Sequence, residues 1–489
     1  MSETTRTTAA DDSREKKYLR WYNKVGYGAG DVGGNVVYAF IAFFVMIYLT
    51  DTVGLNPGII GTLIMVARIF DGISDIFFGS LIDKTHTKMG KARPWMFWAY
   101  FGCAAMIVAI FAIPPSLGDF AMYAWFFITY VLLNAVFFTA NNIAFSTLTA
   151  LITKNAEERV QMGSIRFVFA FGTSLLIQVS TVGLVEAFGG GAEAWRNVAI
   201  IYALVGLIVN TISVFSVREL PAEVLYERGD EDAEGEQAAI VADKPTLLAS
   251  LKLLVANKYY LMIVLVFILG QVATAMLGMG IYFMKYILGD AGYFSTFAWF
   301  INIPMILMLM ATPFIVKWAG SIYWVNLYGY IIGFIGRLLV IVAAFMGNIP
   351  LMLVFTAVGS IGMAPLQGTL NALIAEASEN TFMTKNKRID GMMFSATSLG
   401  VKIGGGIGVA VTGWLLAASG YVGDSDVQPE SALNMLQFMY LWMPAIVLGI
   451  VALVLSRLKV EQANKKLRAE LAEGGHDENP LSSASLVLS

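Results

Sequence analysis

Long apolar runs, separated by short polar or glycine- and proline-containing segments, dominate the chain. A run of about 20 apolar residues is long enough to cross a bilayer as a helix. This pattern predicts about twelve spans, six on each side of a polar segment. The first six cover residues 26–50, 57–82, 94–114, 119–150, 160–187 and 196–216. The second six cover residues 256–288, 293–317, 321–346, 349–376, 389–419 and 433–457. We therefore expect an all-α integral membrane protein.

Polar segments divide this pattern into five predicted parts. These are an N-terminal tail (1–24), a six-helix bundle (25–216), a linker (217–250), a second six-helix bundle (251–458) and a C-terminal tail (459–489). The linker is rich in acids between Glu227 and Glu236, so it cannot bury itself and should be solvated. The first 24 residues contain no apolar stretch, which argues against a cleavable signal peptide.

The composition supports a membrane protein and excludes several other classes. Hydrophobic residues make up 57% of the 489 residues and charged residues only 14%, whereas soluble proteins carry about 25% charged residues. A single cysteine, Cys103, excludes a disulfide framework, and two histidines are too few for a histidine-rich metal centre. The net charge of −3 argues against nucleic-acid binding. No phosphate-binding Gly-x-x-x-x-Gly-Lys-Ser/Thr run and no Gly-x-Ser-x-Gly elbow occurs, so we expect no enzyme and no cofactor beyond a transported ion.

Lysine and arginine predict the orientation, because cytoplasmic loops are enriched in both. If the N-terminus is cytoplasmic, the loops on the far side contain only Arg196 and Lys285. The opposite loops contain many more, among them Lys84, Lys88 and Lys91. We expect a multi-pass protein of the cell (inner or plasma) membrane with both termini in the cytoplasm.

The second span contains charges that a hydrocarbon environment disfavours, namely Arg68, Asp71 and Asp75. Asp71 and Asp75 are four residues apart and therefore share one helical face, on which Ser74 adds a neutral oxygen. This all-oxygen set suits one small monovalent cation. The alternative is a structural network in which Arg68 pairs with one acid and Lys402 with the other. The two interpretations are compatible, because a lysine that competes with the cation couples the two binding events.

Glycine-rich stretches occur in the first and eleventh predicted spans. The first runs from Gly26 to Asn35, and the second, Gly400 to Gly408, surrounds Lys402. Glycines let a neighbouring helix approach closely or let the helix itself break. Glycine-interrupted spans at matching places in two halves indicate the central site of a transporter.

Further polar side chains inside spans are candidate site residues. Asn142 and Thr139 lie in the fourth span, Arg166 in the fifth and Gln367 in the tenth. Amides within spans often bond only across helices. Arg166 is the stronger candidate, because a buried guanidinium needs an acceptor and binds hydroxyl or carboxylate oxygens well.

The loop after the second span suggests a gating latch. Asp83 ends a helix, where its charge opposes the helix dipole and calls for a basic partner. The loop before the eleventh span offers Lys385, Lys387 and Arg388. We expect these groups to join the two halves when the central cavity faces outward.

Four motifs, taken in order, resemble those of the glycoside–pentoside–hexuronide:cation symporters, the melibiose-permease-like branch of the major facilitator superfamily. The motifs are Tyr27-Gly28-x-Gly30-Asp31, Ala67-Arg68-Ile-Phe-Asp71-x-x-x-Asp75, Gly90-Lys91-x-Arg93-Pro94-Trp95 and Lys402-x-Gly404. The resemblance covers residues 25–458. It implies twelve transmembrane helices in two six-helix bundles, with alternating access around a central cavity.

The resemblance also implies roles for single residues near the ion. Asp71 and Asp75 match the two cation-binding acids, and Thr139 matches a threonine near them. Lys402 matches the lysine that faces the acids, and with Arg68 it would couple ion and substrate. Ser74 stands where the melibiose branch has asparagine, which leaves Na⁺, Li⁺ and H⁺ open as the coupling ion.

The sugar-binding positions depart from the melibiose branch. Asn35 and Asn142 stand where those members carry aspartate, Ser146 and Gln367 where they carry tryptophan, and Arg166 is retained. Tyr27, Asp31 and Lys402 complete the expected substrate site. Carboxylates would repel an anionic substrate, so asparagine at two positions resembles the glucuronide and pentoside branches. An acidic glycoside and a neutral pentoside both remain open.

Taken together, these features predict a secondary active transporter that carries a glycoside, pentoside or hexuronide with a cation. The alternatives are a passive facilitator or a sugar sensor on the same fold, or a cation-coupled transporter of a charged amphiphile. The expected partners are a small sugar or glycoside and membrane lipid, with no nucleic acid. A monomer would suffice for function.

Overall fold

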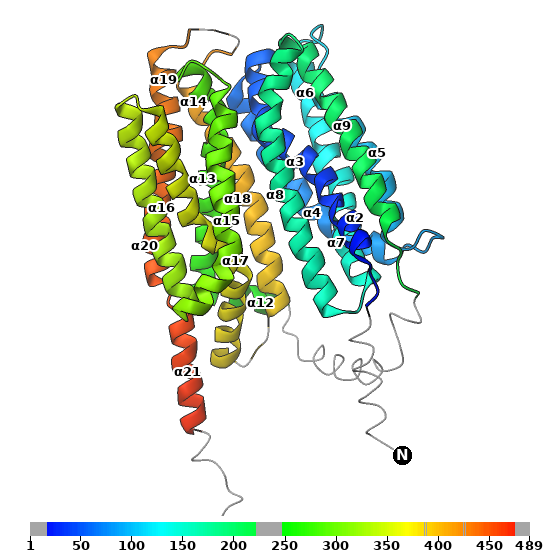
Figure 1. The fold of residues 1–489 in the computed structure, drawn as a ribbon, viewed down its shortest axis with the longest axis vertical. Coiled ribbons are helices and arrows are strands. Elements are labelled where there is room, and N and C mark those ends of the chain that lie inside the picture. The colour runs from blue at the N-terminus through cyan, green and yellow to red at the C-terminus, as the bar shows by residue number, and fades with distance from the viewer. Residues whose placement is uncertain are drawn as a thin grey trace, which may run out of the picture. The chain divides into compact units, whose positions relative to one another are not determined.

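A computed structural model describes residues 17–221, 247–385, 387, 389–423, 425 and 427–474. Every named element among these residues is a helix (Figure 1). The predicted N-terminal tail, the linker and the end of the C-terminal tail fall largely outside the described residues.

Helices of the first half follow the predicted spans closely. They are α2 (Trp21–Gly28), α3 (Gly30–Ile47), the π-helical segment η1 (Tyr48–Thr52), α4 (Pro57–Asp83), α5 (Arg93–Ile110), α6 (Asp119–Val131), the π-helical segment η2 (Leu132–Phe138), α7 (Thr139–Ile152), α8 (Ala156–Ala187) and α9 (Gly191–Ser216). The first span is interrupted at Ala29, within its glycine-rich stretch. The fourth span contains η2 between two α-helical parts.

The second half is organised in the same way. Its helices are α12 (Leu247–Ala256), α13 (Lys258–Gly278), α14 (Gly280–Tyr286), α15 (Tyr293–Ala319), α16 (Ile322–Phe345), α17 (Ile349–Lys385), α18 (Asp390–Ala418), α19 (Glu430–Gln437), the π-helical segment η3 (Phe438–Trp442), α20 (Met443–Arg457) and α21 (Val460–Gly474). The helix α17 runs beyond the predicted limit of residue 376, because its polar end pairs with α21. Asn464 donates to Glu376, and Arg468 forms an ion pair with Glu379.

The expectation of a twelve-span membrane protein is confirmed. Among the described residues, eleven helices are long and apolar enough to cross a membrane. The helix α4 supplies the remaining span with its 27 residues, but it is not among those eleven. It carries four charged side chains, Arg68, Asp71, Asp75 and Asp83.

Contacts group the chain into two compact units. The first unit comprises residues 1–234, 271–303 and 402–444, and the second comprises 235–270, 304–401 and 445–489. The first unit therefore includes segments from both halves of the sequence, among them α14, α19 and much of α18. The limits expected for the two six-helix bundles stay a prediction.

Aromatic residues build much of the core of the first unit. Phe40 stacks on Phe111 with ring centroids 4.2 Å apart, and Trp195 stacks on the same Phe111 at 5.9 Å. Tyr48 packs against this group from η1. These contacts fix the end of the first span against α5 and α9.

Glycines hold α16 and α17 together in the second unit. A Cβ added to Gly329 would lie 2.8 Å from the carbonyl oxygen of Gly362, and one added to Gly336 would lie 2.7 Å from the backbone nitrogen of Gly359. Such short separations leave no room for a side chain, so the two backbones pack directly against each other.

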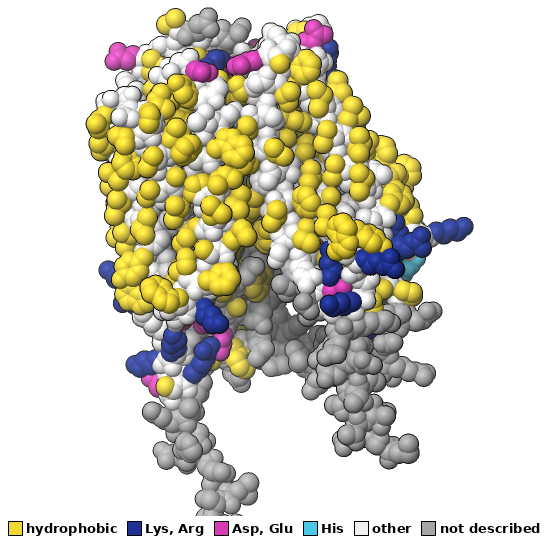
Figure 2. Space-filling model, viewed as in Figure 1, with side chains coloured by type: hydrophobic (Ala, Val, Ile, Leu, Met, Phe, Trp, Pro, Cys, Tyr) yellow, Lys and Arg dark blue, Asp and Glu magenta, His cyan; other side chains and the backbone are white. Residues whose placement is uncertain are grey.

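The outer faces of the helices are apolar. Phe120, Phe314 and Trp318 are 86%, 77% and 89% exposed, as suits side chains that face lipid. Figure 2 shows hydrophobic side chains along the flanks of the helices, with Lys and Arg side chains mainly near the lower ends of the helices in this view and a few near the upper ends.

Candidate functional site

The helix α4 carries the acids at the centre of the candidate site. Asp71 is 6% exposed, and its Oδ1 accepts a hydrogen bond of 2.8 Å from the Thr139 hydroxyl. Its Oδ2 lies 3.8 Å from a terminal nitrogen of Arg68. Asp75, one turn further along, is more open, with its side chain 36% exposed. The two carboxylates therefore share a helical face but have different surroundings.

Lys402 of α18 faces both acids. Its ammonium group contacts Asp75 Oδ2 and lies 3.6 Å from Asp71 Oδ1. A positive charge thus sits between the two carboxylates, where the sequence predicted a small cation. The ion site and the structural network, which the sequence left as alternatives, involve the same atoms.

The charges of this cluster balance. Arg68 and Lys402 carry two positive charges against the two negative charges of Asp71 and Asp75. Balance of this kind is needed because an isolated charge within a span is costly. A further metal ion would add an uncompensated charge unless Lys402 moved away from the acids. Within the described residues, no group of three or more His, Cys, Asp or Glu side chains could hold a metal ion. The expected monovalent cation at Asp71 and Asp75 stays a prediction.

Glycines bring Lys402 within reach of α4. A Cβ added to Gly61 would lie 3.0 Å from the backbone of Ala410, and one added to Gly413 would lie 2.2 Å from the carbonyl oxygen of Pro57. At Gly406 a Cβ would meet the side chain of Arg68 at 3.2 Å. The glycines of α18 therefore permit a close helix crossing, and the helix itself continues unbroken through this stretch.

The π-helical segment η2 ends directly before Thr139, whose hydroxyl contacts Asp71. The Oγ1 of Thr139 lies 2.9 Å from the carbonyl oxygen of Asn134, five residues earlier, and also reaches Asp71. π-Helical turns are frequent at functional sites because they alter the direction of the following side chains. Ser74, expected as a cation ligand, donates to the backbone oxygen of Asp71 at 2.9 Å. The cation-binding roles of these residues stay predictions.

A second ion pair joins α3 to α8 within the first unit. Arg166 donates from Nε to Asp31 Oδ2 at 2.7 Å and from Nη2 to Asp31 Oδ1 at 3.4 Å. The Asn35 side chain donates to the backbone oxygen of Asp31 at 2.9 Å. The sequence placed these three residues in the substrate site without pairing the two charges.

Aromatic rings orient the Arg166 guanidinium. Its Cζ lies 4.2 Å from the ring centroid of Phe145 and 6.0 Å from that of Tyr27. The Tyr27 hydroxyl in turn donates to the backbone oxygen of Phe145 at 2.8 Å. Tyr27 is therefore a support for Arg166, and its own hydroxyl is already bonded.

Two other expected substrate residues share an open face of α7. Asn142 and Ser146 are both exposed and lie four residues apart, whereas Thr139 on the same helix is buried against Asp71. Gln367 belongs to the second unit, where its side-chain nitrogen lies 3.9 Å from the Met305 sulfur. Substrate binding by these residues stays a prediction.

The gating latch remains an expectation. Asp83 is exposed in the first unit at the end of α4, and Lys385 is exposed in the second unit at the end of α17. Lys387 is described, but Arg388 lies outside the described residues.

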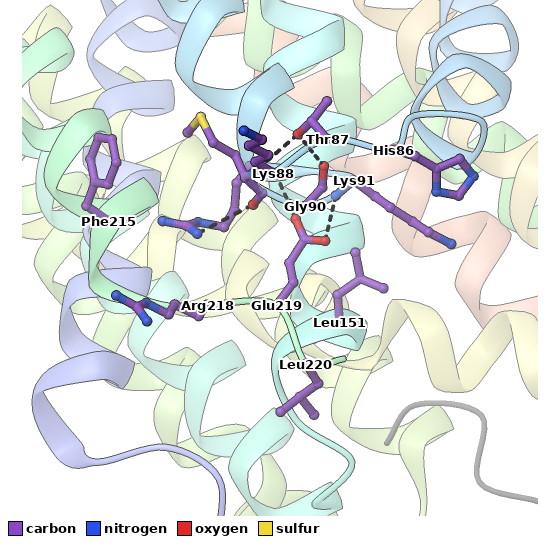
Figure 3. Close-up of a pocket in the computed structure, with 12 residues that line it drawn as sticks. His86, Thr87, Lys88, Gly90, Lys91, Leu151, Phe215, Arg218, Glu219 and Leu220 are labelled. Carbon is purple, nitrogen blue, oxygen red and sulfur yellow. Dashed lines mark hydrogen bonds between the residues drawn. The ribbon is translucent and has the colours of Figure 1, made fainter. Parts of the chain in front are cut away.

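Sequence reasoning missed Glu219, which organises the basic loop between α4 and α5 (Figure 3). Its carboxylate accepts hydrogen bonds from the backbone nitrogens of Lys91, Ala92 and Arg93 at 2.7, 2.9 and 3.0 Å. These amides start α5, so the negative charge also suits the helix dipole. The Lys-x-Arg-Pro motif is thus anchored to the end of the first six spans. A carboxylate two residues after an apolar run was the available signal.

Known proteins match this chain over nearly its whole length. A model of the family described as MFS/sugar transport protein matches residues 26–462. The isoprimeverose transporter of Lactiplantibacillus pentosus is 28% identical over 472 residues, covering 95% of this chain and 94% of that protein. YagG of Escherichia coli (strain K12), whose name classes it provisionally as a glycoside/cation symporter, is 26% identical over 458 residues, covering 91% of this chain and 93% of that protein.

Solved structures agree on the fold. The crystal structure of a D-xylose–proton symporter matches with a TM-score of 0.63 and 15% identity, covering 90% of this chain and 97% of that chain. At this identity the likeness concerns the fold alone. It confirms the expected major facilitator architecture.

Proposed function

Because the chain belongs to the MFS/sugar transport protein family, within its glycoside–pentoside–hexuronide:cation symporter branch, we propose that it takes up a neutral glycoside or pentoside together with a cation. Transport proceeds by alternating access, with the ion at Asp71 and Asp75 and the sugar beside Arg166 and Asn142. No chemical step and no cofactor is involved.

The balanced cluster of Arg68, Asp71, Asp75 and Lys402 carries the cation-coupling part of this proposal. A cation that binds the acids displaces the ammonium group of Lys402, and a proton neutralises one of the acids. Either event frees Lys402 and changes the contact between α4 and α18. Binding at the acids is thereby linked to movement of a helix, which is what coupling requires. Asp75, the more exposed acid, is the entry point.

The pairing of Arg166 with Asp31 favours a neutral sugar over a uronide. Both guanidinium nitrogens that face Asp31 already donate to its carboxylate. A uronide carboxylate would therefore find no uncompensated cation at Arg166, whereas sugar hydroxyls can share the existing donors and acceptors. The relative from Lactiplantibacillus pentosus is named an isoprimeverose transporter, which makes isoprimeverose the first sugar to test.

We propose the inner or plasma membrane as the location, with both termini in the cytoplasm. The basic loop between α4 and α5 contains Lys84, Lys88 and Lys91, which supports its placement on the cytoplasmic side. A monomer contains the whole candidate site.

Uptake into proteoliposomes tests the proposal. The purified protein is offered isoprimeverose, a β-glucuronide and a galactoside, each under a Na⁺, Li⁺ or H⁺ gradient and without one. We expect accumulation of isoprimeverose against its gradient with one of these ions, and little uptake of the glucuronide. Asp75→Cys should abolish the stimulation by the cation while substrate exchange persists.

The same assay distinguishes the alternatives. Equilibration without accumulation under every ion gradient would identify a facilitator, and binding without uptake would identify a sensor. Strong, cation-driven uptake of the glucuronide would contradict the argument from the Arg166–Asp31 pair.

A further inference from the structure

Asp51, at the end of the first span, is a buried carboxylate that the candidate site does not use. It is 8% exposed and lies in the π-helical segment η1. Its Oδ2 accepts from the Lys285 ammonium at 2.6 Å and from the Tyr286 hydroxyl at 2.7 Å. Its Oδ1 accepts from the Tyr421 hydroxyl. The carboxylate is thus bonded on both oxygens to residues more than 200 positions away in the sequence.

Asp51 and its three partners, Lys285, Tyr286 and Tyr421, form a junction that neighbouring contacts extend. The Thr50 hydroxyl lies 2.7 Å from that of Tyr282 in α14. A Cβ added to Gly423 would lie 2.0 Å from the Thr50 carbonyl oxygen, so the loop after α18 packs directly on the backbone of η1. The ring of Tyr421 meets that of Tyr282 edge to face at 5.6 Å. Three segments of the first unit therefore converge on Asp51: η1, α14 and the loop after α18.

The buried charge of Asp51 requires all of its hydrogen-bond donors to be in place. Burial raises the pKa of the Tyr421 hydroxyl, so this group stays protonated and can donate to Asp51. The Asp51 carboxylate is buried, whereas the Lys285 side chain is 38% exposed. Removal of a partner would leave the buried carboxylate without compensation, which is unfavourable. Asp51 also lies in a π-helical turn, a feature frequent at functional sites.

The junction lies at the end of α4 opposite the basic loop. Asp51 precedes Pro57, where α4 begins, whereas the lysines of the basic loop follow Asp83, where α4 ends. Under the proposed orientation Asp51 is therefore on the extracytoplasmic side. Lys285 is one of two basic residues in the loops predicted to lie on that side, and the ion pair explains why it is there.

We propose that Asp51, Lys285, Tyr286 and Tyr421 form a clasp that closes the extracytoplasmic end of the transport pathway and must open for the substrate to enter. The inference rests on the proposed alternating-access transport, although it is independent of the sugar and the ion. The clasp ties the end of the first span to the seventh span and to the loop before the twelfth. Those segments come from different halves of the sequence, and rocking of the halves would have to break these bonds in the outward-open state. The clasp residues position the helices and do not contact substrate.

Cysteine accessibility in the full-length protein tests the clasp. Cys103, the single natural cysteine, is fully buried, so the parent protein gives the background labelling. A reporter is introduced by Asn142→Cys, on the open face of α7. Right-side-out vesicles are treated with a membrane-impermeant maleimide, and the labelling rate is compared with and without Lys285→Met or Tyr421→Phe. We expect each clasp variant to raise the external labelling rate about tenfold, because it shifts the population toward the outward-open state.

Matched controls separate gating from general loosening. Lys285→Arg keeps the charge and should keep labelling slow. Arg196→Met removes an exposed ion pair with Glu193 near the start of α9 and should have no effect. Unchanged labelling in both clasp variants, with monodisperse protein, would overturn the clasp, as would an equal rise in Arg196→Met. Uptake is measured in the parent protein, which keeps Asn142. If labelling rises but this uptake shows no dependence on a cation, the clasp stands and cation coupling is wrong. If uptake is cation-driven and labelling is unchanged, the reverse holds.

Discussion

At the scale of single residues, Asp71 and Asp75 show how one motif yields two unlike carboxylates. They are one helical turn apart, which the sequence made plain. Asp71 is buried and bonded to Thr139, while Asp75 is partly exposed and contacts Lys402. Only Asp75 can exchange its partner without opening the interior of the first unit. We therefore propose that Asp71 holds the ion and Asp75 admits it.

The Thr139 hydroxyl gives a test at this scale. Thr139→Val removes the hydroxyl that donates to Asp71 and offers a neutral oxygen to the cation. We therefore expect the cation concentration for half-maximal uptake to rise about tenfold. This change is equivalent to about 1.4 kcal/mol, a typical loss for a hydrogen bond to a charged group. Thr139→Ser keeps the hydroxyl and should stay near wild type. Thr129→Val removes a buried hydroxyl that donates to the backbone of α6, and serves as the matched control. An unchanged cation dependence in Thr139→Val would exclude Thr139 from the ion site.

At the scale of elements, two glycine-rich stretches that look alike in sequence form different structures. The stretch around Lys402 stays helical and packs closely on α4, whereas the one in the first span is interrupted at Ala29. Glycine lowers the cost of both outcomes. Close packing occurs in both stretches, since a Cβ added to Gly28 would lie 2.5 Å from Ile165 and one added to Gly406 would lie 3.2 Å from Arg68. Within α18 the surroundings differ from one glycine to the next: Gly413 faces the backbone of Pro57, and a Cβ added to Gly405 would meet nothing within 4 Å.

This contrast predicts opposite effects for the same substitution. Gly413→Ala places a Cβ against a carbonyl oxygen that cannot move freely, so we expect a loss of about 1–3 kcal/mol and a lower melting temperature in detergent. Gly405→Ala adds the same methyl group in open space and should raise helix stability by about 0.5–1 kcal/mol. Uptake should fall in Gly413→Ala only, because Lys402 would be held away from the acids. Equal melting temperatures for the two variants would show that α18 does not pack on α4 in this way.

At the scale of the whole molecule, the uneven distribution of lysine and arginine supports one orientation, with the basic loop between α4 and α5 in the cytoplasm. The Asp51 clasp and the Asp71–Lys402 cluster would then lie at different depths of the membrane, one at the outer end and one within the spans. Movements of the helices would connect them.

Cysteine labelling measures this orientation directly. Lys88→Cys in the basic loop should react with an impermeant maleimide only after right-side-out vesicles are permeabilised. Glu193→Cys, near the start of α9 and 79% exposed at its side chain, should react in intact vesicles. The wild-type protein, with its buried Cys103, sets the background. Reaction of Lys88→Cys in intact vesicles would reverse the proposed orientation.

The sequence by itself determined the class of this protein, its spans and the identity of the central acids. Apolar runs of membrane length must form helices, because backbone groups in hydrocarbon have no water to bond. Charges inside such runs are equally conspicuous, so Arg68, Asp71, Asp75 and Lys402 could be found without a fold. Ser74 could be placed on their face, but the bond of its hydroxyl to the Asp71 backbone could not be foreseen.

Only the tertiary structure decided which charge meets which. Arg166 and Asp31 were both expected at the substrate site, but their mutual pairing, on which we base the proposal of a neutral sugar, depends on how α3 packs on α8. The contacts of Asp51 and Glu219 were not predicted from the sequence, because each residue lies near the end of a span. A carboxylate there does not stand out until its partners are known. Those partners are backbone amides or side chains far along the chain, and helical periodicity carries no information about distant contacts.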